Sequence, residues 1–314
     1  MKTSWLNTND SFKARMIGKL LGDGSITIQQ RRKPRFQFTH KSSDCNWSNY
    51  CYSNLKEFIP LNPPKYQKTV DLRLKKGYST AYRVQSKTSN IITYLRKKWY
   101  SEFGKVIPID LMEEYFNEES LAWWYMDDGH LKHKDGILKK VILSTESFTI
   151  DEINWLKNFL HNKYNLTFHK DKQNRLLLYD QFQIHYFLYL ITPHMHWSMH
   201  RKTINNITYK SKSQIKRTTI YLPTALKIKY PTFEINTVLN ILSDIITSYK
   251  NGTFYRDYLF TITNKQYLTT KGYQIVLTES NLSNLYFLYN LTGISFSRLA
   301  TLSFKINTMR SPII

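Results

Sequence analysis

The sequence predicts an α+β protein with two similar units, each with the element order αββαββα and an antiparallel sheet, followed by a smaller C-terminal α/β extension. An apolar helical turn that ends in Asp-Gly occurs twice, as MIGKLLGDGS from Met16 and as LAWWYMDDGH from Leu121. A similar order of helices and alternating strands follows each copy, which indicates an internal repeat. We expect the units to cover residues 1–110 and 111–210, and the extension to cover 211–314.

The first unit begins with a helix over Ser11–Gly24, whose apolar residues recur at helical spacing. Gly18 and Gly22 leave one face of this helix bare, so that a second helix can approach closely. The elements expected after it are a hairpin over Ser25–Lys41, a helix over Asp44–Phe58, strands over Lys65–Leu74 and Ala81–Gln85, and a helix over Thr88–Tyr100.

The second unit repeats this order. Its expected elements are a helix over Glu118–Gly129, a hairpin through Lys132–Leu143, a helix over Thr149–Lys163, strands over Leu166–His169 and Arg175–Leu178, and a helix over Gln181–Ile191. Thr149 and Glu152 have the spacing of a capping box, which supports the start of the middle helix.

The C-terminal extension follows a different pattern. Its expected elements are a basic linker over Lys210–Arg217, a helix over Asn236–Tyr249, strands over Tyr258–Thr263 and Tyr273–Thr278, and two short helices within Ser283–Phe304. Gly293 between the last two helices is typical of a helix-turn-helix motif, with Ser295–Leu302 as its recognition helix. A plain helical hairpin is the alternative.

The charge balance indicates a polyanionic partner. Lys and Arg number 45 against 23 Asp and Glu, so the formal net charge is +22 and the isoelectric point is about 9.7. Aromatic residues make up 15% of the chain, which together with the regular periodicity excludes a disordered basic tail. We expect a folded nucleic-acid-binding protein; a structural basic protein without sequence preference is the alternative.

Several basic and amide side chains are candidates for DNA contact. Four cations lie at the tip of the first hairpin, and Gln and Arg on a two-stranded ribbon match the adenine and guanine edges in the major groove. A solvated hairpin face is the alternative. The candidates are Gln29, Arg31, Arg32, Lys33, Arg35, Gln37, Lys75, Lys76, Lys132, Lys134, Lys139, Arg201 and Arg298.

The two Asp-Gly helix ends are candidates for a metal site. A carboxylate at the last turn of a helix opposes the helix dipole, so it is a cost unless a cation compensates for it. Two such ends that meet about a pseudo-twofold axis would hold their carboxylates close together, which suits a divalent metal ion. Asp23 and Asp128 are the residues concerned.

This pair of helices resembles the signature helices of single-chain LAGLIDADG homing endonucleases, and WWYMDDG is similar to the version found in introns. The eighth motif position, a metal ligand in that family, is kept as Asp23 and Asp128, whereas the often acidic sixth position is Leu21 and Met126. The resemblance implies saddle-shaped DNA-binding sheets, and a monomer that uses Mg²⁺ or another divalent cation such as Mn²⁺. It also implies cleavage of both strands of a long asymmetric site, which leaves 3′ overhangs.

The resemblance also implies a set of residues around the metal. His40 and Glu146 match the strand position that orients water, and Lys105 and Lys202 match the basic residue near the scissile phosphate. Gly22 and Asp127, at the preceding motif position, join Asp23 and Asp128 as metal-site candidates, and either Asp127 or Asp128 could be the inward carboxylate. Surface, capping and backbone-contact roles are the alternatives for His40, Glu146 and the two lysines.

Other classes of site have little support. His194, His196 and His200 lack a nearby Cys or carboxylate, so a loop lining DNA is favoured over zinc binding. Two cysteines are too few for a disulfide framework, and no apolar run is long enough to span a membrane. We expect an intracellular protein, in a low-GC bacterial or phage-infected cytoplasm or an organelle matrix. An intron RNA maturase or a non-cleaving regulator of the same fold is the alternative function.

Overall fold

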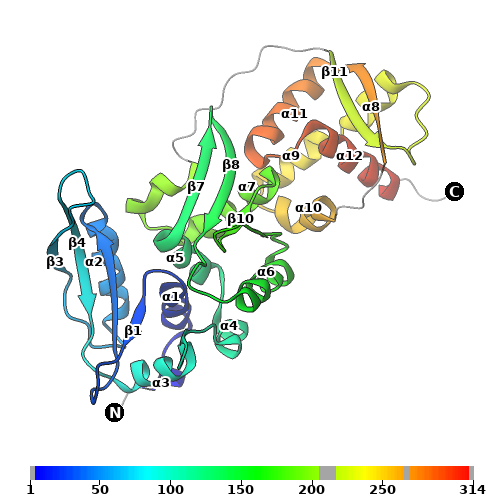
Figure 1. Cartoon of the computed structure of the whole chain (residues 1–314). Helices are drawn as coiled ribbons and strands as arrows, with labels where there is room; N and C mark the ends of the chain where they lie inside the picture. The colour runs from blue at the N-terminus through cyan, green and yellow to red at the C-terminus, as the bar shows by residue number, and fades with distance from the viewer. Residues whose placement is uncertain (1–3, 205–216, 265–268, 311–314) are drawn as a thin grey trace.

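The computed structural model describes residues 4–204, 217–264 and 269–310. The predicted α+β class is confirmed, with helices and antiparallel sheets in two units of the same order (Figure 1). The first unit contains α1 (Asp10–Leu21), β1 (Ser25–Thr27), β2 (Arg35–Lys41), α2 (Cys45–Leu55), β3 (Lys65–Val70), β4 (Tyr78–Gln85) and α3 (Asn90–Trp99).

The second unit contains α5 (Glu118–Asp128), β7 (Gly129–Lys134), β8 (Ile137–Leu143), α6 (Ile150–Tyr164), β9 (His169–Lys170), β10 (Leu176–Leu178) and α7 (Gln181–Ile191). Between the units lie β5 (Tyr100–Ser101), β6 (Gly104–Lys105) and α4 (Ile109–Tyr115), a helix that the sequence pattern did not predict. The short 3-10 helices are η1 (Trp5–Asn7), η2 (Ser42–Asp44), η3 (Thr192–His194) and η4 (Trp197–Lys202).

The two four-stranded sheets have equivalent topologies. Their strand orders are β1-β2-β4-β3 and β7-β8-β10-β9, and all of their pairs are antiparallel. Alternation along β2 places Phe36, Phe38 and His40 on the core face and Arg35 and Gln37 on the other. The first sheet therefore has one face on the core and one free face, as the pattern of its hairpin predicts. In the second sheet β7 alternates in the same way, with Leu131 buried and Lys132 exposed on the free face.

Helices α1 and α5 lie at the centre of the molecule, and local sequence explains where they begin. The Asn9 side chain accepts a hydrogen bond from the Phe12 backbone at 2.8 Å, and Asn117 caps α5 with Ser120 in a capping box. Every α5 residue from Ser120 to Met126 is buried, including Trp123 and Trp124, because the helix is enclosed by both units.

The C-terminal extension is a two-stranded sheet packed on helices. It contains β11 (Arg217–Pro223), α8 (Pro231–Leu239), α9 (Leu242–Lys250), α10 (Phe254–Thr263), β12 (Thr270–Val276), α11 (Glu279–Thr292) and α12 (Phe296–Arg310). The strand expected at Tyr258–Thr263 is wrong, because Phe254, Tyr258 and Ile262 recur at helical spacing and pack as one face of α10. The helix expected over Asn236–Tyr249 is interrupted between α8 and α9. The expected linker lies outside the described residues except for Arg217, which begins β11.

The extension docks on α7 of the second unit. Arg298 in α12 pairs with Asp180 at 2.9 Å, and the Phe182 ring contacts those of Phe254 and Tyr255. Gly293 has φ +68°, and a Cβ there would lie 2.7 Å from the Gln181 carbonyl oxygen, so only glycine fits.

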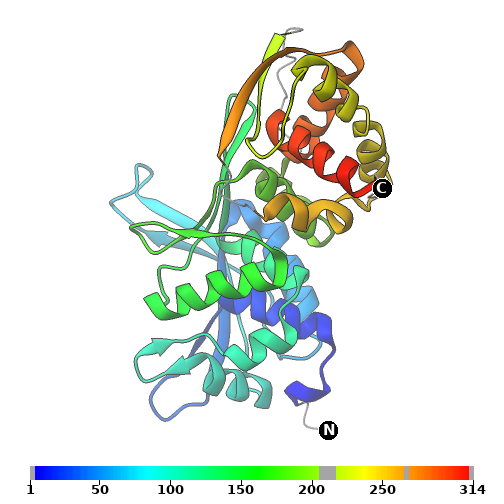
Figure 2. The same cartoon turned by 90° about the vertical axis from the view of Figure 1, so that its right-hand side faces the viewer.

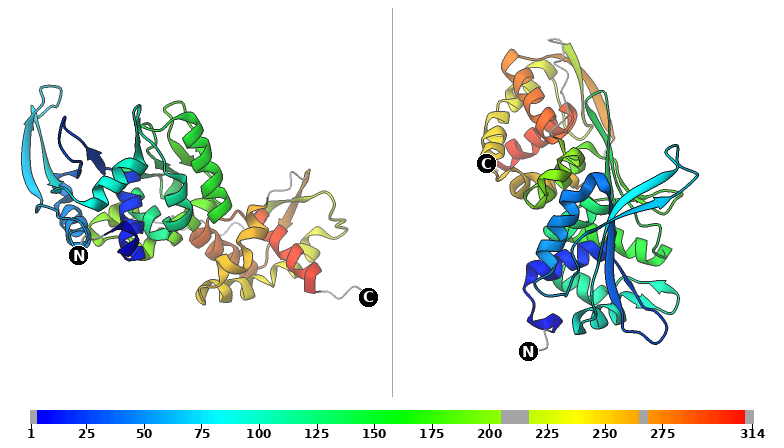
Figure 3. Two further views of the ribbon diagram at one scale, coloured as in Figure 1. Left: turned by 90° about the horizontal axis from the view of Figure 1, so that it is seen from below. Right: turned by 90° about the vertical axis from the view of Figure 1, so that its left-hand side faces the viewer.

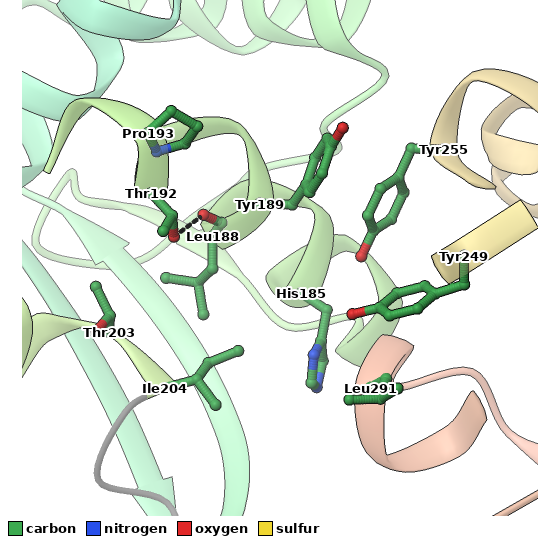
Figure 4. A pocket seen from close by; sticks show the side chains of 10 residues that line it. All are labelled: His185, Leu188, Tyr189, Thr192, Pro193, Thr203, Ile204, Tyr249, Tyr255 and Leu291. Carbon is green, nitrogen blue, oxygen red and sulfur yellow. Dashed lines mark hydrogen bonds between the residues drawn. The ribbon is translucent and has the colours of Figure 1, made fainter. Parts of the chain in front are cut away.

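Beside this junction is a cavity of about 320 Å³ (Figure 4). His185 faces it from α7, and Tyr249, Tyr255 and Leu291 face it from the extension. Among the described residues, no helix combines the length and apolar character needed to cross a membrane.

Candidate active site

Helices α1 and α5 pack closely through small residues and end next to each other. A Cβ added at Gly18 would lie 2.4 Å from the Ser120 carbonyl oxygen, and one at Gly22 would lie 2.6 Å from the Asp127 Cβ. The close approach expected from the spacing of these glycines is therefore confirmed. Gly22 can offer a metal only its backbone carbonyl, because a side chain has no room there.

The Asp127 carboxylate is already occupied by protein donors. One oxygen accepts hydrogen bonds from Lys19 Nζ at 2.7 Å and Trp47 Nε1 at 2.8 Å, and the other accepts from Lys19 Nζ at 2.9 Å and the Asp23 backbone N–H at 3.1 Å. Both side chains of the Lys19–Asp127 pair are fully buried. Burial alone would raise the pKa of Asp127, but Lys19 and His40 outweigh it and hold this pKa well below its usual range. These contacts disfavour Asp127 as the metal ligand and leave Asp128 as the available carboxylate of α5.

His40 belongs to the same buried cluster. Its Nε2 lies 2.8 Å from Lys19 Nζ and 3.4 Å from an Asp127 oxygen, and its Nδ1 lies 2.8 Å from Ser48 Oγ. Burial, followed by the Lys19 charge, lowers the pKa of His40, although its contact with Asp127 opposes this shift. Asp23, His40 and Asp127 are close enough to share a metal ion, but Lys19 already provides the cation between His40 and Asp127.

Asp23 and Asp128 lie in an electrostatic environment that opposes their ionisation. Burial, followed by repulsion from Asp127, raises the pKa of Asp23 to about 7 and that of Asp128 to about 6. The Asp23 side chain nevertheless keeps 33% of its surface exposed, and Asp128 is only half-buried. Both carboxylates are therefore accessible to a cation that would relieve their mutual repulsion.

Lys105 and Lys202 lie at the ends of the two central helices. Lys105 Nζ donates to the Gly24 carbonyl at 3.0 Å, and Lys202 Nζ donates to the carbonyls of Tyr125, Met126 and Asp127 at 2.7–3.2 Å. Burial lowers the pKa of each lysine to about 8, although the nearby carboxylates oppose this shift. These cations compensate for the negative ends of the helix dipoles, which makes the carboxylate-rich site tolerable.

Two other predicted groups lie apart from this cluster. Glu146 is exposed after β8 and, within the described residues, forms no hydrogen bond or ion pair. The three histidines after α7 do not converge, since the metal-type cluster found among described residues is the one at Asp23. The His196 ring instead packs against Tyr50 at 4.4 Å between centroids.

A family model described as the LAGLIDADG DNA endonuclease family matches residues 13–180, which is more than half of the chain and includes α5 and all but the first three residues of α1. The chain belongs to the LAGLIDADG DNA endonuclease family. It is therefore a sequence-specific DNA endonuclease, and nucleases of this family depend on divalent metal.

Individual relatives agree with this membership. A probable intron-encoded endonuclease 1 of Wickerhamomyces canadensis is 27% identical over 218 residues, which cover 66% of this chain and 89% of that protein. The cytochrome b mRNA maturase bI2 of Debaryomyces hansenii is 29% identical over 178 residues, which cover 54% and 65%. The fold resembles that of the homing endonuclease I-WcaI bound to its DNA recognition sequence, with a TM-score of 0.54 and 23% identity, over 64% of this chain and 87% of that one.

The LAGLIDADG sheets present most of the predicted DNA-contact residues at their surface. Exposed positions on the first sheet and its loops are Gln29, Arg31, Arg32, Lys33, Arg35, Lys75 and Lys76, and on the second sheet Lys132, Lys134 and Lys139. Gln37 is half-buried, because its side-chain oxygen accepts hydrogen bonds from Arg83 and Gln85 on β4.

The free faces of both LAGLIDADG sheets also hold like-charged pairs that the sequence pattern did not predict. Arg83 lies directly opposite Lys65 in the register of β4 and β3, and Lys132 lies directly opposite Lys140 in that of β7 and β8. Like charges at such positions destabilise a sheet. These pairs could be predicted only from the strand register, and the register cannot be assigned until it is known which strands pair.

Two residues that are predicted to contact DNA form ion pairs within the LAGLIDADG protein. Arg201 pairs with Asp44 at 3.0 Å and so joins the second unit to the start of α2. Arg298 pairs with Asp180, and its guanidinium also lies over the Phe182 ring. The helix that carries Arg298 is buried or half-buried from Phe296 to Ile306, so the expected recognition helix lacks an exposed face. The extension forms a packed helical pair at this point, and Arg298 stabilises its docking.

Proposed function

We propose that this LAGLIDADG protein makes a Mg²⁺-dependent double-strand break in a long asymmetric DNA target, acts as a monomer and leaves 3′ overhangs. The observation that carries the proposal is the pair of pseudo-equivalent helix ends: Lys105 donates to the Gly24 carbonyl after α1 and Lys202 to the carbonyls at the end of α5. Each lysine also acts on the carboxylate of the other helix, Lys105 on Asp128 and Lys202 on Asp23. One chain thus supplies a carboxylate and a cation for each DNA strand.

The donor set at these helix ends fits a hard divalent cation. Asp23 and Asp128 provide carboxylate oxygens, and the Gly22 backbone provides a carbonyl close by. Mg²⁺ typically takes one or two protein carboxylates and obtains its remaining ligands from water and phosphate. When bound, such an ion would activate water and offset charge on the phosphate.

The protein's own groups have separate roles in this proposal. Lys105 and Lys202 are mostly protonated at neutral pH, and their position at the helix ends suits them to contact the backbone near the cut phosphates. The Lys19–Asp127 pair, with His40, positions the end of α1 through the Asp23 backbone N–H. His40 is then a structural partner of Lys19 in the first half-site. Glu146 stays the predicted water-orienting residue of the second half-site.

The free faces of the sheets are proposed to bind the target. Both include basic side chains opposite one another, Lys65 with Arg83 and Lys132 with Lys140, which a phosphate backbone would neutralise. In the first sheet Gln37 lies directly opposite Gln85, and Ser25, just after the end of α1, lies opposite Gln37, so side-chain amides near the helix end can contact base edges.

A second candidate function is splicing assistance by binding of intron RNA. It is favoured by the similarity to a protein named as a cytochrome b mRNA maturase. That role would need the basic faces but would not need both carboxylates.

The proposal is tested by incubating the protein with a randomised duplex library and Mg²⁺ and sequencing the cut ends, with a chelator as control. Cleavage at one defined sequence with 3′ extensions, abolished by the chelator, is the expected result. Specific binding without cutting would overturn the nuclease proposal, and tighter binding to structured intron RNA than to any duplex would favour the second candidate. Sedimentation of the active complex checks the monomer.

A further inference from the structure

The two-stranded sheet of the extension has one covered face and one free face. Ile220, Leu222, Tyr273 and Ile275 are buried beneath it, where α8 and α12 pack on β11 and β12. The opposite face is open, and its members follow from the alternation and the register. They are Arg217, Thr219 and Tyr221 on β11, and Thr270, Gly272, Gln274 and Val276 on β12.

The chemistry of this free face matches that of the LAGLIDADG sheets. Neither strand contains an acidic residue, and the free face has an exposed cation, Arg217; Lys271 is also exposed but lies opposite Leu222, on the other side of the ribbon. Thr219 lies directly opposite Gln274 in the register, which places a hydroxyl and an amide side by side. The Tyr221 ring lies across Gly272, where a Cβ would be 3.1 Å from Tyr221 Cε1, and 55% of Tyr221 is exposed.

The position of this sheet makes it an extension of the proposed DNA surface. In Figures 2 and 3 it lies on the same side of the molecule as the β3–β4 and β7–β8 hairpins, with α8 to α12 behind it. The Arg298–Asp180 ion pair and the close contact of Gly293 with Gln181 fix the extension on α7. Helix α7 in turn packs on β8 of the second sheet. The free face of β11–β12 is therefore held in a fixed position relative to the free face of the second sheet.

We infer that the free face of β11–β12 binds duplex DNA that flanks the target on the side of the second unit. A two-stranded ribbon fits the major groove of B-form DNA, whereas the major groove of A-form RNA is too deep and narrow for side chains to read. The inference rests on the proposed function, because the duplex must first lie along the two sheets. It assigns the extension's DNA contact to this ribbon rather than to α12.

The test compares affinities of the full chain for the identified target with natural flanks and for duplexes shortened by about one helical turn, ~10 base pairs, at either end. Shortening one end should weaken wild-type binding about 5- to 20-fold, and shortening the other should not. Arg217→Ala/Gln274→Ala should weaken binding to the long duplex by a similar factor. Shortening the duplex and substituting the protein should together weaken binding no more than either change alone, because both changes remove the same interaction.

Arg256→Ala is the matched control, since it removes an exposed cation from α10 rather than from the ribbon. The inference is overturned if neither shortening weakens wild-type binding, if the effects of shortening and substitution on affinity multiply, or if Arg256→Ala weakens binding as much as the ribbon variant. If the wild type still cuts its target in these cases, the proposed function stands without the inference. Failure to find any specific duplex would instead defeat the proposed function, and the inference with it.

Discussion

At the scale of single residues, the buried Lys19–Asp127 ion pair is the interaction on which the geometry of the helix ends depends most. Lys19→Met should lower the free energy of unfolding by about 3–5 kcal/mol, because it leaves the Asp127 charge buried without its cation. Lys19→Met/Asp127→Asn should recover part of this stability, since Asn keeps an acceptor for Trp47 without a charge. Urea denaturation measures both variants, and equal stability of the single and double variants would refute a charge-based role.

The residue scale also shows how far local sequence can predict the site. The doubled Asp-Gly motif predicts Asp23 and Asp128 as metal-site residues, and the structure places both at helix ends near Lys105 and Lys202. The role of Asp127 was not predictable from its neighbours, because its partners Lys19 and Trp47 come from α1 and α2. The burial of His40 could have been predicted, since it shares strand parity with Phe36 and Phe38.

At the scale of elements, the free faces of the sheets hold opposed cations at a cost in stability. Lys132→Ala/Lys140→Ala should weaken target binding and reduce the slope of log K against log salt by about 0.9 for each phosphate that is no longer neutralised. The same change should stabilise the protein by up to about 1 kcal/mol, because it relieves a directly opposed like-charged pair.

Lys163→Ala is the control for this pair, because it removes a cation from α6 rather than from the sheet. Salt titrations of binding and thermal melts of the free protein provide the two readouts. Unchanged binding, or a decrease in stability on removing both sheet lysines, would mean that the face is merely solvated.

Elements themselves were predictable where local pattern and packing agree. Both hairpins, both central helices and α6 follow from alternation, helical spacing and capping residues. The extension was harder, because a short segment such as Tyr258–Thr263 fits a strand or a helix locally and packing on α9 and α12 decides between them. Strand β11 was not predicted, because the basic residues that precede it are typical of a linker.

At the scale of the whole molecule, docking of the extension should depend on pH through His185. Burial at the junction lowers its pKa to about 4, against about 6.5 when unfolded, although a hydrogen bond to the Leu291 backbone partly opposes this. The unfolded chain therefore binds the proton more readily, so stability is full above about pH 6.5 and falls as the pH drops towards 4. Tyr249 and Tyr255, which also line the cavity, have raised pKa values and stay neutral throughout this range.

The expected decrease in stability reaches about 2–3 kcal/mol at pH 4, and His185→Gln should remove that part of the pH dependence. Urea denaturation of both proteins between pH 4 and 7 measures it. Parallel pH profiles for the two proteins would show that His185 does not titrate on unfolding.

The metal-dependent role of the two helix ends is tested most directly by Asp23→Asn and Asp128→Asn on the identified target, with cutting and binding measured on the same preparations. Each variant should lose double-strand cutting while its affinity stays within about tenfold of the wild type, or ~1.4 kcal/mol. That result would assign both carboxylates to the chemistry. Retained cutting, or an equal decrease in binding and cutting, would contradict this role and reduce the two Asp-Gly helix ends to structural turns.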